Sequence, residues 1–365
     1  MNRFLTPFFL YILLSCNSSE DVSSTDNNLN NQYFPPINSQ EWENSTPESL
    51  NWNTSSLNSL YDFLSSKNTR AFIVLKNGKI VLEKYWGSTI TNTGNFDKNS
   101  SWYWASAGKT ITAYLVGIAQ EDGLLNINSK TSTYLGAYWS SLPLEKENLI
   151  TVKHQLTMTT GLDYNVLDVD CTDAICLKYK VDAGSQWFYH NAPYTLLEKV
   201  VSNTAGITYN QYTENNLNSK IGMKGTWIKS GYNNVFYSTA RDAARFGLLI
   251  LNNGKWETKQ LMKDATYFKN MITSSQSLNP SYGYLWWLNG KSSIVYPVLP
   301  NSFNTSLAPA APTDLVAAMG KNGQFIDILP SKNIVVIRFG EAPDNSLVPI
   351  IFHNEIWQYL SAIIN

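Results

Sequence analysis

The fold class is decided by the segment AFIVLKNGKIVLEKYWG, residues 71–87. Two runs of β-forming residues flank Asn77-Gly78, a dipeptide that favours a two-residue hairpin turn because both positions tolerate positive φ. A second hairpin is predicted near the other end of the chain, in QFIDILPSKNIVVIRFG (residues 324–340), with PSKN at 330–333 as its turn. The folded part of the chain is therefore expected to open and close with paired strands.

Helical patterns fill the interval between the two hairpins. In SWYWASAGKTITAYLVGIAQEDGLL (residues 101–125), apolar residues recur at helical spacing from Ser106 onward. Residues 192–204 and 239–252 have similar patterns, and IFHNEIWQYLSAII near the C-terminus is an amphipathic helix by its spacing. This order predicts an α/β fold of the α+β kind, in which an antiparallel sheet joins both chain ends and is flanked by helices.

The composition excludes several classes of protein. The 365 residues are 43% apolar and 15% charged with a net charge of -1, which is enough apolar chain for a large core. No basic block of the kind that nucleic-acid binding requires is present. The 12 Trp, 21 Tyr and 15 Phe are too many for a disordered chain, and 3 His and 3 Cys leave little for a metal site. We expect a folded protein without metal, cofactor or nucleic-acid partner.

The N-terminus has the features of an export signal. Arg3 precedes the apolar run FLTPFFLYILL (residues 4–14), which is too short to span a bilayer and has the length of a secretory h-region. The run ends in LLSC, which resembles a bacterial lipobox. We predict a lipoprotein signal peptide over residues 1–15 and a lipid on Cys16. An ordinary signal peptide with an incidental cysteine is the alternative.

The segment after Cys16 predicts a tether and a location. Residues 17–32 have almost nothing to bury, and we predict a flexible tether over 16–45 and a folded domain over 46–365. The protein is then expected at the outer membrane, on its periplasmic or cell-surface face, held by the lipid anchor only. The remaining cysteines, Cys171 and Cys176, are either a small-loop disulfide or two reduced thiols.

The first motif that carries chemistry is Ser106-Ala107-Gly108-Lys109. At the start of a helix, positions i and i+3 share a face, so the Lys109 amine can lie beside the Ser106 hydroxyl. The serine needs a base, and a lysine serves as one only where desolvation or nearby positive charge lowers its pKa. A helix cap followed by an exposed lysine is the plain structural alternative. The segment is not a P-loop, because position 103 is Tyr where that motif needs Gly.

Two further motifs follow along the chain. Tyr189-His190-Asn191 opens a predicted helix, where a phenol beside an ammonium can relay a proton while Asn191 holds Lys109 or a substrate carbonyl. A second Tyr-x-Asn, at residues 232–234, is interpreted as a turn. The segment AMGKNGQ (residues 318–324) precedes the closing hairpin, and its small residues let a substrate carbonyl approach backbone N–H groups. The alternative is that this segment is a glycine-rich loop whose glycines serve only to bend the chain.

The three motifs in this order resemble the serine β-lactamase-like superfamily, in the branch of class C β-lactamases, carboxylesterases and 6-aminohexanoate-oligomer hydrolases. The resemblance extends to VKHQLTMTTGLDY (152–164), YSTARDAARFGLLILNNG (237–254) and YGYLWWLNG (282–290). It implies a β-lactamase/transpeptidase-like fold with the site between the antiparallel sheet and an all-helical region. It also implies that Ser106 is the nucleophile, Lys109 its general base, Tyr189 the proton shuttle and Asn191 a supporting residue.

The third motif departs from the family pattern, and two interpretations stay open. In one, Lys321-Asn322-Gly323 stands where class C enzymes have Lys-Thr-Gly, and Gln324 supplies an oxyanion N–H. In the other, Ala318-Met319-Gly320 takes the strand position and the N–H of Lys321 is the donor, which we prefer. Tyr164 is a pocket candidate by the same resemblance, with a core tyrosine as the alternative.

The expected function is that of a cofactor-free, monomeric serine hydrolase, which acts through an acyl-enzyme on a small ester or amide. A β-lactamase or D-amino-acid peptidase is the first alternative, although the missing Lys-Thr-Gly argues against efficient β-lactam recognition. A catalytically silent binding module similar to penicillin-binding proteins is the second. No serine has Gly at both −2 and +2, so a nucleophile elbow is excluded, and His154, His190 and His353 are interpreted as structural.

Overall fold

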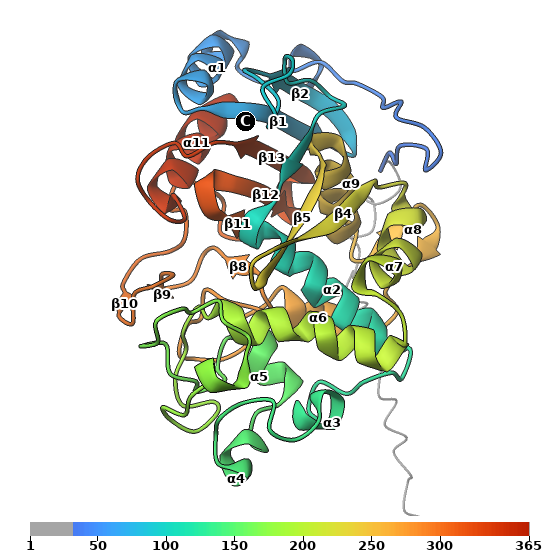
Figure 1. Cartoon of the computed structure of the whole chain (residues 1–365). Helices are drawn as coiled ribbons and strands as arrows, with labels where there is room; N and C mark the ends of the chain where they lie inside the picture. Colours follow the sequence, from blue (N-terminus) through green and yellow to red (C-terminus); the bar gives the residue numbers. More distant parts are fainter. Residues whose placement is uncertain (1–31, 365) are drawn as a thin grey trace, which may run out of the picture. The chain divides into compact units, whose positions relative to one another are not determined.

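A six-stranded antiparallel sheet organises the fold (Figure 1). In the computed structural model, which describes residues 32–364, its strand order is β2-β1-β13-β12-β11-β8. The strands are β1 (Thr69–Lys76), β2 (Lys79–Tyr85), β8 (Trp287–Leu288), β11 (Val316–Gly320), β12 (Gln324–Leu329) and β13 (Ile334–Gly340). Because β1 pairs with β13, strands from the two ends of the folded chain lie side by side, and the predicted sheet is confirmed.

Both predicted hairpins are confirmed. Between β1 and β2, Asn77 and Gly78 have φ of 51° and 79°, the positive values that a type I′ turn requires. A short 3₁₀ turn (Pro330–Lys332) and Asn333 connect β12 to β13. Every residue of these two strands is buried, so apolar residues occupy both of their faces instead of alternating.

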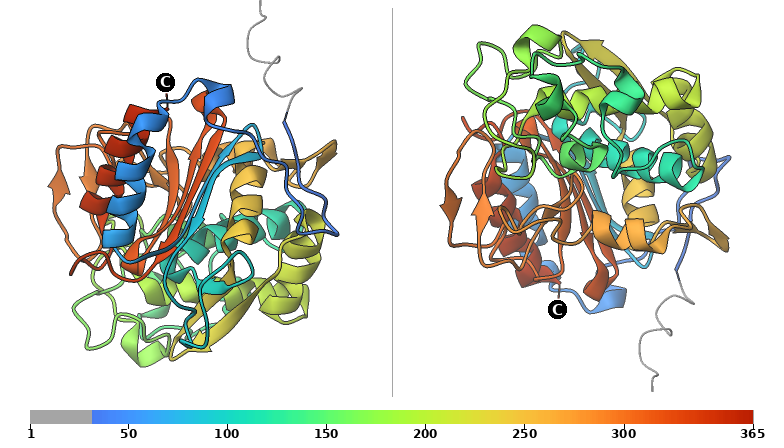
Figure 2. Two further views of the ribbon diagram at one scale, coloured as in Figure 1. Left: turned by 90° about the horizontal axis from the view of Figure 1, so that it is seen from above. Right: turned by 90° about the horizontal axis from the view of Figure 1, so that it is seen from below.

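Helices cover both faces of the sheet (Figures 1 and 2). α1 (Leu57–Ser66) and α11 (Ile350–Ile363) lie together on one face, and α9 (Ala240–Leu251) lies on the other. A capping box between Thr239 and Asp242 begins α9. The helices predicted at 239–252 and at the end of the chain are confirmed.

A helical region lies beside the sheet and completes the arrangement that the family resemblance implies (Figure 1). Its centre is α2 (Lys109–Glu121), which packs against α6 (Asn191–Ala205), the helix predicted at 192–204. α2 is buried from Lys109 to Ala119, as expected for a helix enclosed on all sides. The shorter helices are α3 (Ser132–Leu135), α4 (Leu144–Glu147), α5 (Val152–Leu156), α7 (Tyr209–Thr213), α8 (Ser219–Ile221) and α10 (Ala265–Met271).

The described residues also form three smaller sheets. A three-stranded antiparallel sheet contains β3, β5 and β4 in that order, and two ribbons are formed by β6 with β7 and by β9 with β10. Their bounds are β3 (Ser101–Tyr103), β4 (Gly225–Ser230), β5 (Asn233–Thr239), β6 (Lys255–Trp256), β7 (Lys259–Gln260), β9 (Ile294–Val295) and β10 (Ser302–Phe303). β3 leads directly into the turn that carries Ser106, and α2 follows that turn. The three-stranded sheet therefore fixes the start of the segment that contains Ser106.

The predicted tether is wrong in its C-terminal part, because the folded unit begins at Tyr33 and not at residue 46. Trp42 is 8% exposed and its indole N–H donates to the Gly78 carbonyl at 2.7 Å. The Ser45 N–H donates to the Ile80 carbonyl at 2.9 Å, which attaches the segment to β2. The aromatic residues of this stretch supply apolar area to bury, which a polar tether lacks.

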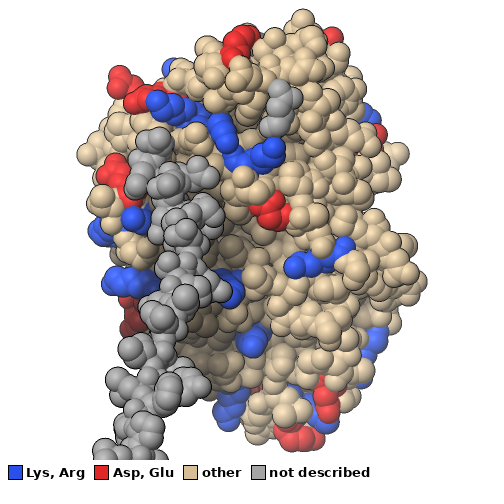
Figure 3. All heavy atoms as spheres, turned by 180° about the vertical axis from the view of Figure 1, so that it is seen from behind, with Lys and Arg blue, Asp and Glu red and all other residues tan. Residues whose placement is uncertain are grey.

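The predicted signal peptide, Cys16 and the tether up to residue 31 lie outside the described residues. Among helices within 32–364, none combines the length and apolar character needed to cross a membrane. On the face of the molecule shown in Figure 3, lysine and arginine side chains are interspersed with acidic ones and separated by uncharged surface.

Candidate active site

The Ser-x-x-Lys motif lies where β3 turns into α2. Ser106 occupies a 3₁₀ turn (Ala105–Gly108), and α2 begins only at Lys109, one turn later than the sequence pattern predicts. Ala105 has φ of 47°, a left-handed conformation that costs a residue with a Cβ about 1 kcal/mol. The preceding Trp104 anchors this turn, because its N–H donates to the Phe236 carbonyl at 2.8 Å. Backbone strain is thus held in place next to the candidate nucleophile.

Ser106 and Lys109 are in contact, as the i, i+3 spacing predicts. The Lys109 amine donates to the Ser106 hydroxyl at 3.0 Å. Lys109 is 3% exposed, and its amine lies 4.1 Å from the centre of the Tyr194 ring and 5.1 Å from that of Tyr189. Burial lowers the pKa of Lys109 from 10.5 to about 7, although the charges of Asp170 and Glu198 act in the opposite direction. Near neutral pH a large fraction of this amine is therefore uncharged and able to accept a proton.

Tyr189 has the opposite tendency. Burial raises the pKa of its phenol well above 10, and an interaction with the Ser106 hydroxyl only partly offsets the rise. An aromatic wall supports the ring: Trp287 stacks on Tyr189 with centroids 5.7 Å apart, and Tyr282 meets it edge-on at 6.2 Å. At neutral pH the phenol keeps its proton, so of these two groups the lysine amine is the one that can take the serine proton, and the neutral phenol can pass a proton on only by receiving another.

The end of β11 approaches the Ser106 turn. β8 pairs only with Val316 and Ala317, so the rest of this edge of β11 is not covered by β8. A Cβ built on Gly320 would lie 2.4 Å from the Trp104 carbonyl oxygen and 3.1 Å from the Ser106 nitrogen, so glycine is needed for this approach. The geometry thus brings the backbone of Gly320 beside the backbone N–H of Ser106.

The remaining residues of the third motif divide into two groups. Lys321 lines the cavity described below, whereas Gln324 is fully buried and exchanges hydrogen bonds with the backbone of Gly340 at 2.7 and 3.0 Å. A Cβ on Gly323 would lie 2.9 Å from the Arg338 guanidinium. Gly323 and Gln324 therefore hold the turn from behind, and the arrangement matches the interpretation in which Gly320 and Lys321 face the site.

A cavity of about 480 Å³ opens over these groups. Ser106, Lys109 and Tyr189 line it together with Lys321, so the structure brings the first, second and third motifs to one place. Its other polar lining includes Asp170, Asn191, Ser230, Asn233 and Asn234, and an apolar part contains Val298, Leu347 and Val348.

Asn191 lines the cavity, but its amide makes a different contact from the predicted one. Its Nδ2 donates to Asp170 Oδ1 at 2.7 Å, and no hydrogen bond to Lys109 is present. Its Oδ1 is buried and has no hydrogen-bond partner among the described residues. The amide thus offers an unused acceptor beside the cavity.

The sequence analysis missed much of the cavity wall, including the polar residues Asp170, Asn233 and Asn234. The second Tyr-x-Asn was interpreted as a turn, whereas its two asparagines begin β5 and both belong to the cavity lining. Asn233 donates to Asp170 at 2.8 Å. Asp170 could have been considered from the sequence because it precedes Cys171. A disulfide at Cys171 would fix the backbone next to this carboxylate.

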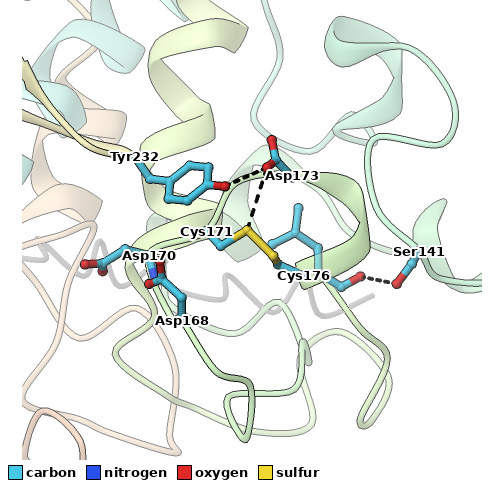
Figure 4. The surroundings of a disulfide bond; sticks show 8 residues. Ser141, Asp168, Asp170, Cys171, Asp173, Cys176 and Tyr232 are labelled. Atoms are coloured by element: carbon cyan, nitrogen blue, oxygen red, sulfur yellow. Dashed lines mark hydrogen bonds between the residues drawn. A yellow bond between two sulfur atoms is a disulfide. The ribbon is translucent and has the colours of Figure 1, made fainter.

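Cys171 and Cys176 form a disulfide, which decides between the two alternatives left open by their spacing (Figure 4). In the same loop, the Asp173 carboxylate accepts a hydrogen bond from the Tyr232 hydroxyl at 2.6 Å. The disulfide therefore closes the loop, and the hydrogen bond from Tyr232 attaches the loop to the turn between β4 and β5. Asp170 directly precedes the loop's first cysteine.

Tyr164 does not line the cavity. Its ring stacks on Phe188 with centroids 3.9 Å apart, and the Lys180 amine lies 3.4 Å from the centre of the same ring. Phe188 itself is a cavity residue, so Tyr164 supports the wall from outside. Tyr164 is therefore not among the residues that line this cavity, because Phe188 lies between its ring and the cavity wall.

The three histidines have the structural roles that were expected. His154 closes a capping box with Thr151 at the start of α5. His190 precedes α6 and is 3% exposed, and burial lowers its pKa to about 4. The His353 ring lies 2.8 Å from the Asp327 carboxylate inside the sheet–α11 interface.

The comparison with known sequences identifies the family to which the chain belongs. The sequence profile of the beta-lactamase family matches residues 68–343, which is most of the chain, and the chain belongs to this family. Members of the family are generally serine hydrolases. The staphylococcal protein flp (Staphylococcus aureus) is 24% identical over 193 residues, covering 49% of this chain and 37% of flp. The chain thus spans well under half the length of this curated relative.

Solved structures agree with the fold. A candidate 6-aminohexanoate-dimer hydrolase from Bacillus anthracis superposes with a TM-score of 0.68 at 18% identity, covering 90% of this chain and 88% of its own. A penicillin-binding protein homologue from Caulobacter crescentus gives a TM-score of 0.66 at 11% identity, covering 84% and 96%. At these identities the likeness concerns the fold and not the substrate.

Proposed function

We propose that the protein is a serine hydrolase that cleaves small esters or amides through an acyl-enzyme on Ser106. The observation that carries the proposal is the 3.0 Å contact between the Ser106 hydroxyl and a buried lysine amine whose pKa is lowered to about 7, at an open cavity. A base with a pKa near the working pH gives the most effective proton transfer.

The proposed reaction has two halves. The neutral Lys109 amine takes the Ser106 proton while the serine oxygen bonds to the substrate carbonyl carbon. The resulting oxyanion is stabilised by backbone N–H groups, for which Ser106 and Lys321 are the candidates. When the bond to the leaving group breaks, the Tyr189 hydroxyl supplies its proton to that group and regains one from the Lys109 ammonium.

Water completes the second half. It attacks the ester carbonyl on Ser106, gives up one proton through the same lysine and tyrosine, and releases the carboxylic acid with the serine hydroxyl restored. The substrate, one water molecule and the side chains named above account for all atoms and protons of the reaction. Asn191 contributes an amide at the cavity wall, as a supporting residue.

A fluorophosphonate probe tests the nucleophile. The wild-type protein should be labelled, and Ser106→Ala should abolish labelling. Hydrolysis of p-nitrophenyl butyrate should fall by at least about a hundredfold in Lys109→Ala, since general base catalysis contributes that much or more. Labelling that survives Ser106→Ala would contradict the proposal. Equal esterase rates in the wild-type protein and in Lys109→Ala would favour a binding module.

Nitrocefin separates the finer alternatives. Slow or absent turnover is expected, because the chain has Lys321-Asn322-Gly323 instead of Lys-Thr-Gly. Rapid, saturable hydrolysis would instead assign the protein to the β-lactamases proper, and release of a terminal D-alanine from a peptide would assign it to the peptidases.

We further propose that the mature protein is a monomer anchored by a lipid on Cys16 at the outer membrane. The supporting features are the apolar run before LLSC and the polar stretch after it. Metabolic labelling with palmitate should mark the wild-type chain and not Cys16→Ala. Protease treatment of intact cells distinguishes the cell-surface face from the periplasmic one, and light scattering of the protein without residues 1–16 tests the monomer.

A further inference from the structure

The two backbone donors proposed for the oxyanion belong to segments that are far apart in the chain. The N–H of Ser106 lies in the 3₁₀ turn that follows β3, here called the nucleophile turn (Ala105–Gly108). The N–H of Lys321 lies in a second 3₁₀ turn that follows β11, here called the oxyanion turn (Lys321–Gly323). Donors of this kind lower the barrier only when both lie within hydrogen-bond distance of the same oxygen. The proposed reaction therefore requires contacts that fix one turn relative to the other.

A side-chain hydrogen bond joins the two segments. The Asn322 amide donates to the Tyr103 hydroxyl at 2.8 Å, across 219 positions of the chain. Tyr103 is the last residue of β3, three positions before Ser106, and Asn322 directly follows Lys321. Neither Tyr103 nor Asn322 belongs to the cavity lining, so the two residues act on a substrate only through the backbone that they hold.

The phenol end of this bond is held by the three-stranded sheet. Tyr103 is opposite Tyr237 in the register of β3 and β5. Its ring stacks on that of Trp102 with centroids 5.3 Å apart, and it meets the Tyr237 ring edge-on at 6.4 Å. The hydroxyl of Tyr103 is therefore a fixed acceptor beside the oxyanion turn.

The asparagine end lies in a turn that is held from behind. Asn322 has φ of 63° and ψ of 18°, a left-handed conformation that asparagine adopts more readily than most residues with a Cβ. The buried Arg338 guanidinium donates to the carbonyls of Asn322 and Gly323 at 2.6 and 3.0 Å. The Gln324 amide donates to the Lys321 carbonyl at 3.2 Å. These donors attach the oxyanion turn to β12 and β13, and not to the nucleophile turn.

Packing alone does not set the direction of the Lys321 N–H. Gly320 limits how closely the two segments approach, because a Cβ there would lie 2.4 Å from the Trp104 carbonyl oxygen. Such a contact fixes a distance, whereas the direction of an N–H depends on the rotation of the turn that carries it. Within residues 32–364, the bond between Asn322 and Tyr103 is the one hydrogen bond that joins the oxyanion turn to β3 and the nucleophile turn.

We infer that Tyr103 and Asn322 are positioning residues, which hold the Lys321 N–H so that it and the Ser106 N–H meet the same oxyanion. This inference rests on the proposed hydrolase activity and adds two residues to its machinery. The oxyanion forms in both acylation and deacylation and is absent from the bound substrate. Loss of the bond should therefore slow both steps by a similar factor and leave substrate binding unchanged.

Tyr103→Phe tests the inference, because it removes the hydroxyl and keeps the ring contacts. For p-nitrophenyl butyrate, kcat and kcat/KM should each fall by about tenfold with KM within about twofold of wild type, since losing an oxyanion donor costs about a hundredfold or more and a misdirected donor costs less. The inhibition constant of n-butylboronic acid should rise by a similar factor, because its tetrahedral adduct with a serine places an oxygen at the same donors.

Asn322→Gly removes the other partner and keeps the left-handed backbone, which glycine adopts without strain. It should have the same effect, and the double variant should be slower than Asn322→Gly by no more than about twofold, because both side chains act through one bond. Tyr134→Phe is the matched control: Tyr134 is half-buried like Tyr103, its hydroxyl accepts from the Asn126 N–H at 2.7 Å, and it lies outside the cavity lining. It should leave kcat and the inhibition constant within about twofold of wild type.

The inference is overturned if Tyr103→Phe leaves both kcat and the inhibition constant unchanged, if it raises KM without lowering kcat, or if Tyr134→Phe lowers kcat equally. It is also overturned if the effects of the two substitutions multiply in the double variant. Urea unfolding checks that each variant is folded, and Tyr103→Phe decides alone if Asn322→Gly is not. A wild-type protein without hydrolysis that depends on Ser106 fails the proposed function, and this inference with it. An active wild-type protein whose variants match it fails this inference only.

Discussion

Replacing Lys109 by methionine should abolish hydrolysis and at the same time stabilise the fold. Lys109 lies in the core at 3% exposure, and burial lowers its pKa from 10.5 to about 7. Between these two values the unfolded chain binds a proton that the folded chain does not, so stability rises with pH in this range. Below pH 7 the buried lysine destabilises the folded state to its full extent, and above pH 10.5 this destabilisation is absent. Methionine has a similar volume and no charge to desolvate.

The size of the effect follows from the two pKa values. A factor of ten in a protonation equilibrium is worth about 1.36 kcal/mol, so the lysine destabilises the folded state by about 4 kcal/mol at pH 7 and about 2 kcal/mol at pH 9. The variant also loses the 3.0 Å hydrogen bond to Ser106, worth about 1 kcal/mol. Lys109→Met should therefore gain about 3 kcal/mol at pH 7 and about 1 kcal/mol at pH 9.

Urea unfolding followed by tryptophan fluorescence, at pH 7 and pH 9, measures both values. Lys255→Met is the control, since Lys255 is exposed and its loss changes the net charge equally. It should leave the free energy of unfolding within about 0.5 kcal/mol of wild type at both pH values. A Lys109→Met protein that is no more stable than wild type at pH 7, or whose gain does not shrink at pH 9, would refute the account of Lys109 as a desolvated base.

Three further results are expected. The acidic limb of kcat/KM should lie near the pKa of Lys109, about 7, and Glu198→Gln should move it to lower pH because the Glu198 charge raises that pKa; a limb that stays in place would contradict the coupling. Gly320→Ala should lower kcat by about a hundredfold, since its Cβ would lie 2.4 Å from a backbone oxygen of the nucleophile turn, whereas Gly94→Ala, with open space around it, should leave kcat unchanged. Replacing both Cys171 and Cys176 by serine should lower the free energy of unfolding by about 2 kcal/mol, measured in urea, and an unchanged midpoint would show that the loop is held without the bridge.

The architecture of the sheet was predictable because its signals are local. Asn77-Gly78 and the Pro330–Lys332 turn set two hairpins, and apolar runs without alternation indicate strands that are covered on both faces. The Ser106–Lys109 pair was predictable for the same reason, since three residues of helical chain determine which side chains share a face. The pairing of the first long strand with the last rested on element order and is confirmed by the register of β1 and β13.

Other features depend on contacts between segments that are distant in the chain. The tether boundary was misplaced because Trp42 reveals its role only when the Gly78 carbonyl is beside it. The environment of Asp170 is formed by Asn191 and Asn233, 21 and 63 residues away, and no spacing rule relates them. Tyr164 was predicted as a pocket residue from the family resemblance, but its ring stacks on Phe188 and is not part of the cavity lining.

The chain by itself therefore determined its strands, its main helices and a serine with a lysine one turn away, since each depends on neighbours within a few residues. Tertiary structure decided that this lysine is dry enough to act as a base, that Gly320 and not Gln324 meets the nucleophile turn, and that a carboxylate lies beside the cavity. Desolvation and charge compensation are properties of everything that surrounds a group, and the chain assembles those surroundings only by folding.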